Sequence, residues 1–209
     1  MKTQKTIYHI IVDKSGSMCD CIDQTINGFN EQINKIKELE IEFPEQLMTI
    51  GLTTFNTDVE HNYFMQPVET AYKMNNENYI PNGSTAMLDA MGHTMRKLSG
   101  LQESSNAEMP TTVVMIILTD GYENASREYT LKNVKQMIET REAMGTWTFS
   151  FLGATLDAVD VAEKMSIRRE NSIAFSKAAM QNQVWDRLGN SMKDYYDKKR
   201  KGEDIRKLF

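Results

Sequence analysis

The 209-residue sequence has only two cysteines and three histidines, and it has no long apolar run. The cysteines, Cys19 and Cys21, are one residue apart, a spacing that strains a disulfide and closes almost no loop. We therefore expect a reduced pair, and without a second pair of Cys or His nearby the pattern does not indicate a zinc site. No stretch approaches the ~18 apolar residues that a membrane-spanning helix needs, so no membrane partner is predicted.

The sequence also lacks an excess of positive charge, since its formal net charge is -5. Nucleic-acid binding calls for clustered Lys and Arg, so no nucleic-acid partner is predicted. The one basic cluster, 198–201, is interpreted as a solvated helix end. Lys2 and Lys5 precede the apolar run 7–12, but this run is too short for a secretion signal, is broken by His9 and has no small-residue cleavage site. A cytoplasmic location is the resulting expectation.

Familiar catalytic motifs are missing as well. The chain has neither the GxxxxGK[ST] phosphate-binding loop nor the GxSxG nucleophile elbow. Its three histidines, His9, His61 and His93, are scattered over a predicted strand, a predicted hairpin and a predicted helix, and none is paired with a nucleophile. The sequence therefore predicts a protein that is not an enzyme.

What the sequence has is a regular alternation of apolar strands and amphipathic helices. The predicted strands are 7–12, 47–55, 59–65, 112–118, 147–152 and 172–175. The predicted helices are 22–39, 85–98, 131–138, 157–165 and 178–196. The turn at Asn56-Thr57-Asp58 indicates a hairpin, the polar stretch 102–110 indicates a loop, and Asp157 is a candidate helix N-cap. This order predicts one α/β domain over residues 1–209, with a mostly parallel sheet and helices on both faces.

Polar side chains follow two of the buried strands. Asp13, Ser15 and Ser17 alternate along an extended loop, so their oxygens can face one point, and Gly16 lets the loop bend tightly. Ligands of such sheets bind outside the carboxyl ends of the strands, where Asp120 also lies.

Thr85, at a predicted helix start, and Asp120 complete a set of five hard-oxygen ligands with Asp13, Ser15 and Ser17. Hard oxygens favour Mg²⁺, with Mn²⁺ or Ca²⁺ as alternatives, over zinc or copper. Two carboxylates among neutral oxygens would leave the ion Lewis-acidic, so an open position would attract an external carboxylate. Each segment by itself could equally be a turn or a helix cap.

Three segments, IVDKSGSM, PNGSTAMLDA and IILTDGYEN, resemble in sequence and order the motifs of von Willebrand factor type A (VWA) domains with an intact metal-ion-dependent adhesion site (MIDAS). The resemblance covers about residues 5–192 and leaves 193–209 as a charged helix end. It implies a doubly wound, Rossmann-like sheet of six strands with one antiparallel edge. It also implies direct metal contact by Ser15 and Ser17, contact of Asp13 and Asp120 partly through water, and either mode for Thr85. The lack of a signal peptide and of structural disulfides resembles intracellular prokaryotic or phage members.

The leading hypothesis is a metal-dependent protein-binding module that captures a Glu or Asp of a protein partner. The alternatives are a metal-dependent hydrolase or phosphotransferase, and an assembly component of a larger complex. The acidic loop residues Asp20, Asp23 and Glu123 could tune the choice of partner, and Tyr122 could contact it at the rim. The partner's identity and the oligomeric state are not predicted.

Overall fold

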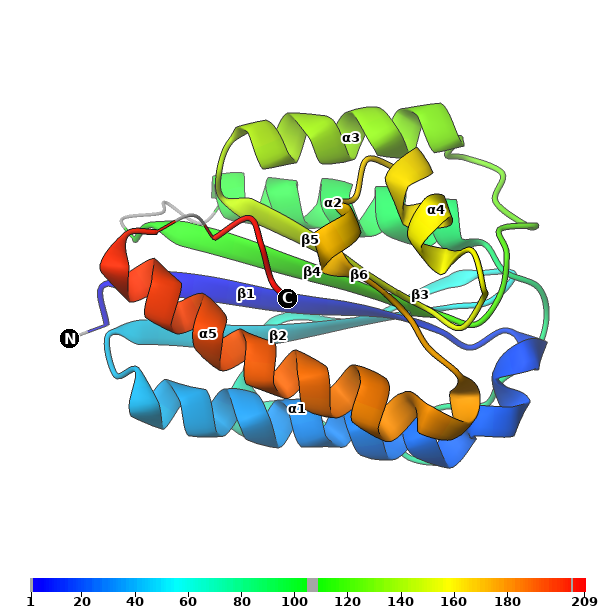
Figure 1. Ribbon diagram of the computed structural model, residues 1–209, viewed down its shortest axis with the longest axis horizontal. Coiled ribbons are helices and arrows are strands. Elements are labelled where there is room, and N and C mark those ends of the chain that lie inside the picture. Colours follow the sequence, from blue (N-terminus) through cyan, green and yellow to red (C-terminus); the bar gives the residue numbers. More distant parts are fainter. Residues whose placement is uncertain (1, 105–108, 204) are drawn as a thin grey trace.

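The computed structural model describes residues 2–104, 109–203 and 205–209, and in them it forms a single six-stranded sheet (Figure 1). The strand order is β3-β2-β1-β4-β5-β6. The strands are β1 (Gln4–Asp13), β2 (Gln46–Phe55), β3 (Val59–Pro67), β4 (Thr111–Thr119), β5 (Trp147–Gly153) and β6 (Ser172–Ala174). Only β3 is antiparallel to its neighbour, because the short turn after β2 returns the chain as a hairpin. The predicted mostly parallel sheet with one antiparallel edge strand is confirmed.

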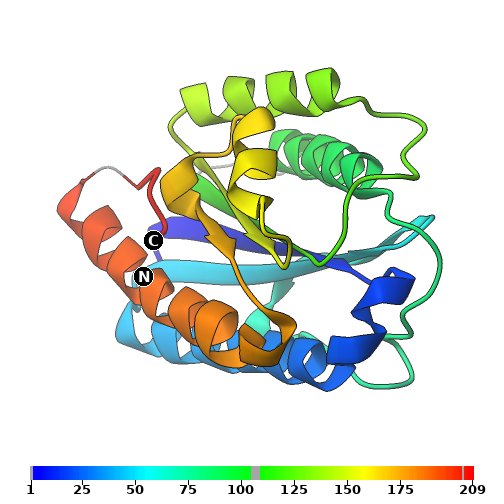
Figure 2. The same ribbon diagram turned by 45° about the vertical axis from the view of Figure 1, so that its right-hand side comes forward.

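Helices cover both faces of the sheet, as predicted. The α-helices are α1 (Ile22–Glu42), α2 (Met87–Ser104), α3 (Leu131–Ala143), α4 (Ala158–Lys164) and α5 (Arg187–Lys201). Figures 1 and 2 show α1 and α5 side by side on one face and α2, α3 and α4 on the other. No helix in the described part of the chain combines the length and apolar character needed to cross a bilayer.

The central strands β1 and β4 are buried on both faces, which explains their continuous apolar sequences. One hydrophobic core lies between the sheet and α1 with α5, and includes Phe29 and Trp185. The other lies under α2, α3 and α4, and includes Met91 and Met95. The methionines of α2 therefore fill the core, where their flexible side chains adapt to irregular space.

Several predicted boundaries are wrong. Helix α2 continues through Ser99 and Gly100 to Ser104, and residues 105–108 of the predicted polar loop lie outside the described residues. The predicted closing helix 178–196 is not one regular helix. It begins with a 3₁₀ turn (Lys177–Ala179) and a π-helix (Gln181–Asp186), and becomes α-helical at Arg187. Asp157 stands at the N-cap position of α4, but its side chain makes no capping hydrogen bond.

The C-terminal segment is less solvated than the sequence suggests. Tyr195, Tyr196 and Leu208 are buried, so the packed core continues past residue 192. Within the basic cluster 198–201, the Lys199 ammonium turns inward and lies within hydrogen-bonding distance of four oxygens at the amino ends of β1, β2 and β4. These are Thr6 Oγ1 (2.8 Å), Gln46 Oε1 (3.0 Å), Thr112 Oγ1 (3.0 Å) and the Lys5 carbonyl (3.4 Å). Burial lowers the pKa of Lys199 to about 8. The interpretation of this cluster as a solvated helix end is therefore wrong for Lys199.

Candidate metal centre

The predicted site residues gather where the strand order reverses, between the carboxyl ends of β1 and β4. From β1 the chain proceeds outward to β2, and later outward in the other direction from β4 to β5. Parallel pairing sets Val12 beside Leu118, so Asp13 and Thr119 are the next residues along the two strands. Crevices at this point of doubly wound sheets are where ligands bind.

Asp13 ends β1 with its carboxylate fully buried. Its Oδ1 accepts a hydrogen bond from the Ser15 N–H (2.7 Å), and its Oδ2 accepts one from the Thr119 hydroxyl (2.6 Å). Burial raises the pKa of Asp13 to about 6, and the bonds from Thr119 and Ser15 oppose this rise because they stabilise the carboxylate. The side chain is thus fixed in orientation.

The two serines and Asp120 form a continuous set of oxygens. Ser15 Oγ lies 3.2 Å from Ser17 Oγ, and the Ser17 hydroxyl donates to Asp120 Oδ1 over 2.5 Å. The Asp120 side chain is fully buried, and its Oδ2 lies 2.6 Å from the ammonium of Lys177.

Thr85 joins this set through the loop after β4. Its N–H donates to Asn124 Oδ1 (2.9 Å), and its carbonyl accepts from the Asn124 N–H (3.0 Å). A methyl group placed on Gly121 would lie 3.3 Å from Thr85 Oγ1 and 3.7 Å from Ser17 Oγ, so both hydroxyls flank Gly121. The structure therefore brings Asp13, Ser15, Ser17, Thr85 and Asp120 into one cluster.

The three loops are also bonded to one another through their backbones. The Gly16 N–H donates to the Gly83 carbonyl (3.1 Å), and the Asn82 N–H donates to the Lys14 carbonyl (2.9 Å). Gly83 has φ +72°, and a side chain there would also meet Thr57 Oγ1 at 2.7 Å. These bonds fix the first loop against the segment that carries Thr85.

This donor set fits a hard divalent cation. Oxygens bound at ~2.1 Å and at right angles around Mg²⁺ lie ~3.0 Å apart, close to the spacing of the serine hydroxyls. Within the described residues, no group of three or more His, Cys, Asp or Glu is arranged to hold a metal ion. The cluster has only two carboxylates, and its other three oxygens are hydroxyls. A metal site here would need the hydroxyls as ligands, so the assignment stays a prediction.

Three residues at the site had no role in the sequence analysis. Thr119 orients Asp13 through its hydroxyl. It directly precedes Asp120 in the third motif, but the motif alone gave it no role. Tyr79 donates from its hydroxyl to the Asp13 carbonyl over 2.6 Å. Lys177, which pairs with Asp120, comes from the segment after β6 and carries no sequence signal at all.

The structure bears on two expectations for the loop after β4. Glu123 is not free to select partners, because its carboxylate accepts from the N–H groups of Leu88, Ala125 and Ser126 and joins this loop to the start of α2. Tyr122 is exposed, as a rim contact would be, and its hydroxyl donates to Asp157 Oδ1 over 2.8 Å.

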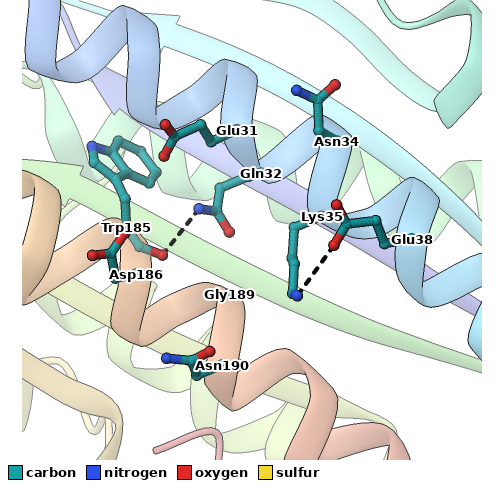
Figure 3. A pocket seen from close by; sticks show the side chains of 9 residues that line it. All are labelled: Glu31, Gln32, Asn34, Lys35, Glu38, Trp185, Asp186, Gly189 and Asn190. Carbon is teal, nitrogen blue, oxygen red and sulfur yellow. Dashed lines mark hydrogen bonds and ion pairs between the residues drawn. The ribbon is translucent and has the colours of Figure 1, made fainter.

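A second polar region is a hollow of about 450 Å³ between α1 and the start of α5 (Figure 3). Gln32 donates from Nε2 to the Trp185 carbonyl over 3.1 Å on one side, and Lys35 pairs with Glu38 on the other. None of the five candidate ligands lines it. Its lining contains no cysteine, serine, threonine or histidine.

The three histidines, dispersed in the sequence, meet in the structure. His9 Nε2 lies 2.9 Å from Thr53 Oγ1, which lies 3.2 Å from His61 Nδ1, and the rings of His61 and His93 are 6.3 Å apart. Gly51, paired with His9 across β1 and β2, leaves room for the imidazole, since a Cβ there would lie 2.2 Å from His9 Nδ1. The two hydrogen bonds link β1, β2 and β3, the ring contact extends the group to α2, and none of these contacts involves a candidate ligand.

The fold of the chain is similar to that of several solved structures. No protein-family model matches the chain, and no curated protein matches it. Among solved structures, the vWF domain of the type V pili tip protein Mfa5 from Porphyromonas gingivalis is 8% identical, with a TM-score of 0.60 over 93% of this chain and 97% of that one. Manganese-loaded TRAP protein of Plasmodium vivax is 14% identical, with a TM-score of 0.58 over 88% of this chain and 73% of that one.

Proximal thread matrix protein 1 from the mussel byssus, with a zinc-occupied MIDAS motif, is 15% identical, with a TM-score of 0.53 over 92% of this chain. The present chain spans 45% of that protein's length. At these identities the comparisons establish the fold, which is that of von Willebrand factor type A domains. They do not favour the predicted resemblance to intracellular prokaryotic or phage members, which stays a prediction.

Proposed function

We propose that this chain is a divalent-metal-dependent protein-binding module. Asp13, Ser15, Ser17, Thr85 and Asp120 hold Mg²⁺, with Mn²⁺ or Ca²⁺ as alternatives, and the site captures a Glu or Asp of a protein partner. The observation that carries the proposal is the convergence of these five oxygen-bearing side chains, from three separate segments, at the switch point of the sheet. Two similar structures, one described as manganese-loaded and one as having a zinc-occupied MIDAS motif, support a divalent metal in this chain.

The chain's own groups prepare the site for this role. Thr119 and the Ser15 N–H hold Asp13 in one orientation, and the Ser17 hydroxyl holds Asp120. Three of the five side chains are neutral hydroxyls. The negative charge that the site offers to a divalent ion therefore comes from its two carboxylates alone. When bound, the metal would supply a Lewis-acidic position for one further carboxylate.

The enzymatic alternative gains no support from the structure. The three histidines bond to Thr53 and Glu128 and not to the candidate ligands. The similar structures are a pilus tip protein, a thread matrix protein and TRAP protein, and none of these descriptions names an enzyme.

An assembly component of a larger complex is the second candidate. Its support is that several structures with this fold are described as parts of fibres, including a pilus tip protein, a minor pilin and a byssal thread protein. It differs from the first proposal because capture of the partner would not require metal. The cytoplasmic location also stays a proposal, and the free thiols of Cys19 and Cys21 agree with it.

The first test is metal binding and its dependence on Asp13. We expect Mn²⁺ and Mg²⁺ to raise the melting temperature of the wild type, because a ligand that binds only the folded state stabilises it. Asp13→Ala should abolish the shift. Asp23→Ala, which removes an exposed carboxylate of α1, is the matched control and should keep it. No shift in the wild type at millimolar metal would refute the metal-dependent function.

The second test concerns the acidic group of the partner. In Mn²⁺-loaded protein, acetate and a short Glu-containing peptide should lower the relaxation enhancement of solvent water, because a carboxylate replaces a metal-bound water. An alcohol of similar size should leave it unchanged. If the protein binds metal but carboxylates do not change the relaxation enhancement, the proposed metal site stands and the proposed capture of a carboxylate is wrong.

A further inference from the structure

Lys177 contacts the candidate metal site from a distant part of the chain. It begins the 3₁₀ turn Lys177–Ala179, which packs against the 3₁₀ helix Gly16–Cys21 at the carboxyl end of the sheet (Figures 1 and 2). Its ammonium lies 2.6 Å from Asp120 Oδ2 and donates to the Ser17 carbonyl over 2.6 Å. It also lies 3.7 Å from Asp20 Oδ2. Two of these three oxygens belong to residues of the proposed metal site.

The ammonium is the counter-charge of the site. Among the described residues, Lys177 is the only cation that pairs with either candidate carboxylate. The Asp120 side chain is fully buried, and a buried carboxylate without a counter-charge is costly. The 2.6 Å contact between the Lys177 ammonium and Asp120 Oδ2 is a charge-assisted hydrogen bond, and it stabilises both charges.

Lys177 is also able to leave. Its side chain is 29% exposed, and it has a flexible four-carbon stem. Its contacts are made by one atom, Nζ, so a rotation of the stem would release Asp120 and Ser17 together. The exposed carboxylate of Asp20 lies beside it as an alternative partner.

We propose that Lys177 is a built-in cation that competes with the divalent metal for Asp120, and that it sets the metal affinity of the site. The inference rests on the proposed metal-dependent function. A divalent ion bound to Asp120 beside the ammonium would be repelled by a like charge, so metal binding requires the ammonium to withdraw. The same ammonium offsets the charge of Asp120, one of the two carboxylates of the metal-free site, which lets the chain fold without metal.

The decisive change is Lys177→Met, which keeps an unbranched side chain one atom shorter and removes the charge. We expect its dissociation constant for Mn²⁺ to be lower than that of the wild type by about tenfold or more, because a like charge is removed from a poorly solvated site. The metal-free variant should melt at a lower temperature than the wild type, and Mg²⁺ should produce a larger upward shift in the variant than in the wild type.

Two variants separate the role of Lys177 from an overall effect of charge. Lys193→Met removes a lysine of α5 that pairs with Glu42 away from the site, and it should leave the affinity for Mn²⁺ unchanged. Lys177→Arg keeps the charge and should stay within a few-fold of the wild type. If Lys177→Met does not fold without metal, Lys177→Gln is used, since its amide can still donate to Asp120.

The measurement is isothermal titration of the full 209-residue chain with Mn²⁺, with circular dichroism to confirm folding. Tighter binding in the uncharged Lys177 variants alone supports the inference. Equal affinity in the wild type and both uncharged variants, or weaker binding in them, overturns it and leaves the metal-binding function standing. If neither the wild type nor these variants bind Mn²⁺ at millimolar concentration, the metal-binding function and the inference fail together.

Discussion

At the scale of single residues, the site depends on a hydroxyl that binds no ligand directly. Thr119 donates to the buried carboxylate of Asp13 from the neighbouring strand. This bond both orients Asp13 and stabilises its charge. A buried acceptor that loses its donor retains the full cost of its lost hydration.

Thr119→Val should therefore destabilise the protein, by about 1–3 kcal/mol, since it keeps the side-chain shape and removes the donor. Thr49→Val is the matched control. Thr49 is also a buried strand threonine, but its hydroxyl has no hydrogen-bond partner among the described residues. The control should be neutral or stabilising in urea unfolding, and equal losses in the two variants would contradict the assigned role of Thr119.

At the scale of elements, the contact between α1 and the start of α5 depends on a helix position without a side chain. The buried ring of Trp185, in the π-helix before α5, packs directly on Gly28 of α1 (Figure 3 shows Trp185 facing α1). A Cβ at Gly28 would lie 1.9 Å from Trp185 Nε1. Gly28 is thus required for close packing, although glycine is a poor helix former.

The two helical glycines at this contact should respond in opposite directions to alanine. Gly28→Ala should destabilise the protein by about 1–3 kcal/mol, because the indole has to move within a packed core. At Gly189 of α5 the nearest atom to a new Cβ is Lys35 Cγ at 3.4 Å, so Gly189→Ala should stabilise by up to about 1 kcal/mol through helix propensity. Thermal melts of both variants test this, and a stabilising Gly28→Ala would refute the packing argument.

The elements also show which parts of the fold can be predicted from sequence. The strands and helices follow from hydrophobic periodicity, which is a local property, and the hairpin follows from its turn residues. The irregular start of the last helix was missed because the apolar positions Met180, Val184 and Leu188 fit a continuous helix equally well. The π-helix at Gln181–Asp186 is recognised from the backbone conformation, and the spacing of the apolar residues does not reveal it.

At the scale of the whole molecule, stability should depend on pH through the gathered histidines. Burial lowers the pKa of His9 to about 3 and that of His61 to about 4, and the nearby charge of Lys97 acts in the same direction on both. Their unfolded values are near 6.5, so below that pH the unfolded chain takes up protons that the folded one does not. Their contribution is fully present above pH 6.5 and is lost as the pH falls.

We expect His9 to contribute a loss on the order of 2 kcal/mol between pH 7 and pH 5. His9→Gln, whose amide can still reach Thr53, should lower this pH dependence by a similar amount in urea unfolding. The raised pKa of Asp13 acts in the opposite direction, but it is common to both proteins and cancels in the comparison. Identical pH dependence in the two proteins would show that His9 is not held neutral.

The sequence by itself determined the class of fold and proposed Asp13, Ser15, Ser17, Thr85 and Asp120 as metal ligands. It could do so because strands, helices and ligand-bearing loops leave local patterns of spacing and residue type. Only the tertiary structure placed Lys177 on Asp120, Thr119 on Asp13 and the three histidines together. Those contacts join residues far apart in the chain, and the path of the backbone through the packed sheet decides which side chains meet.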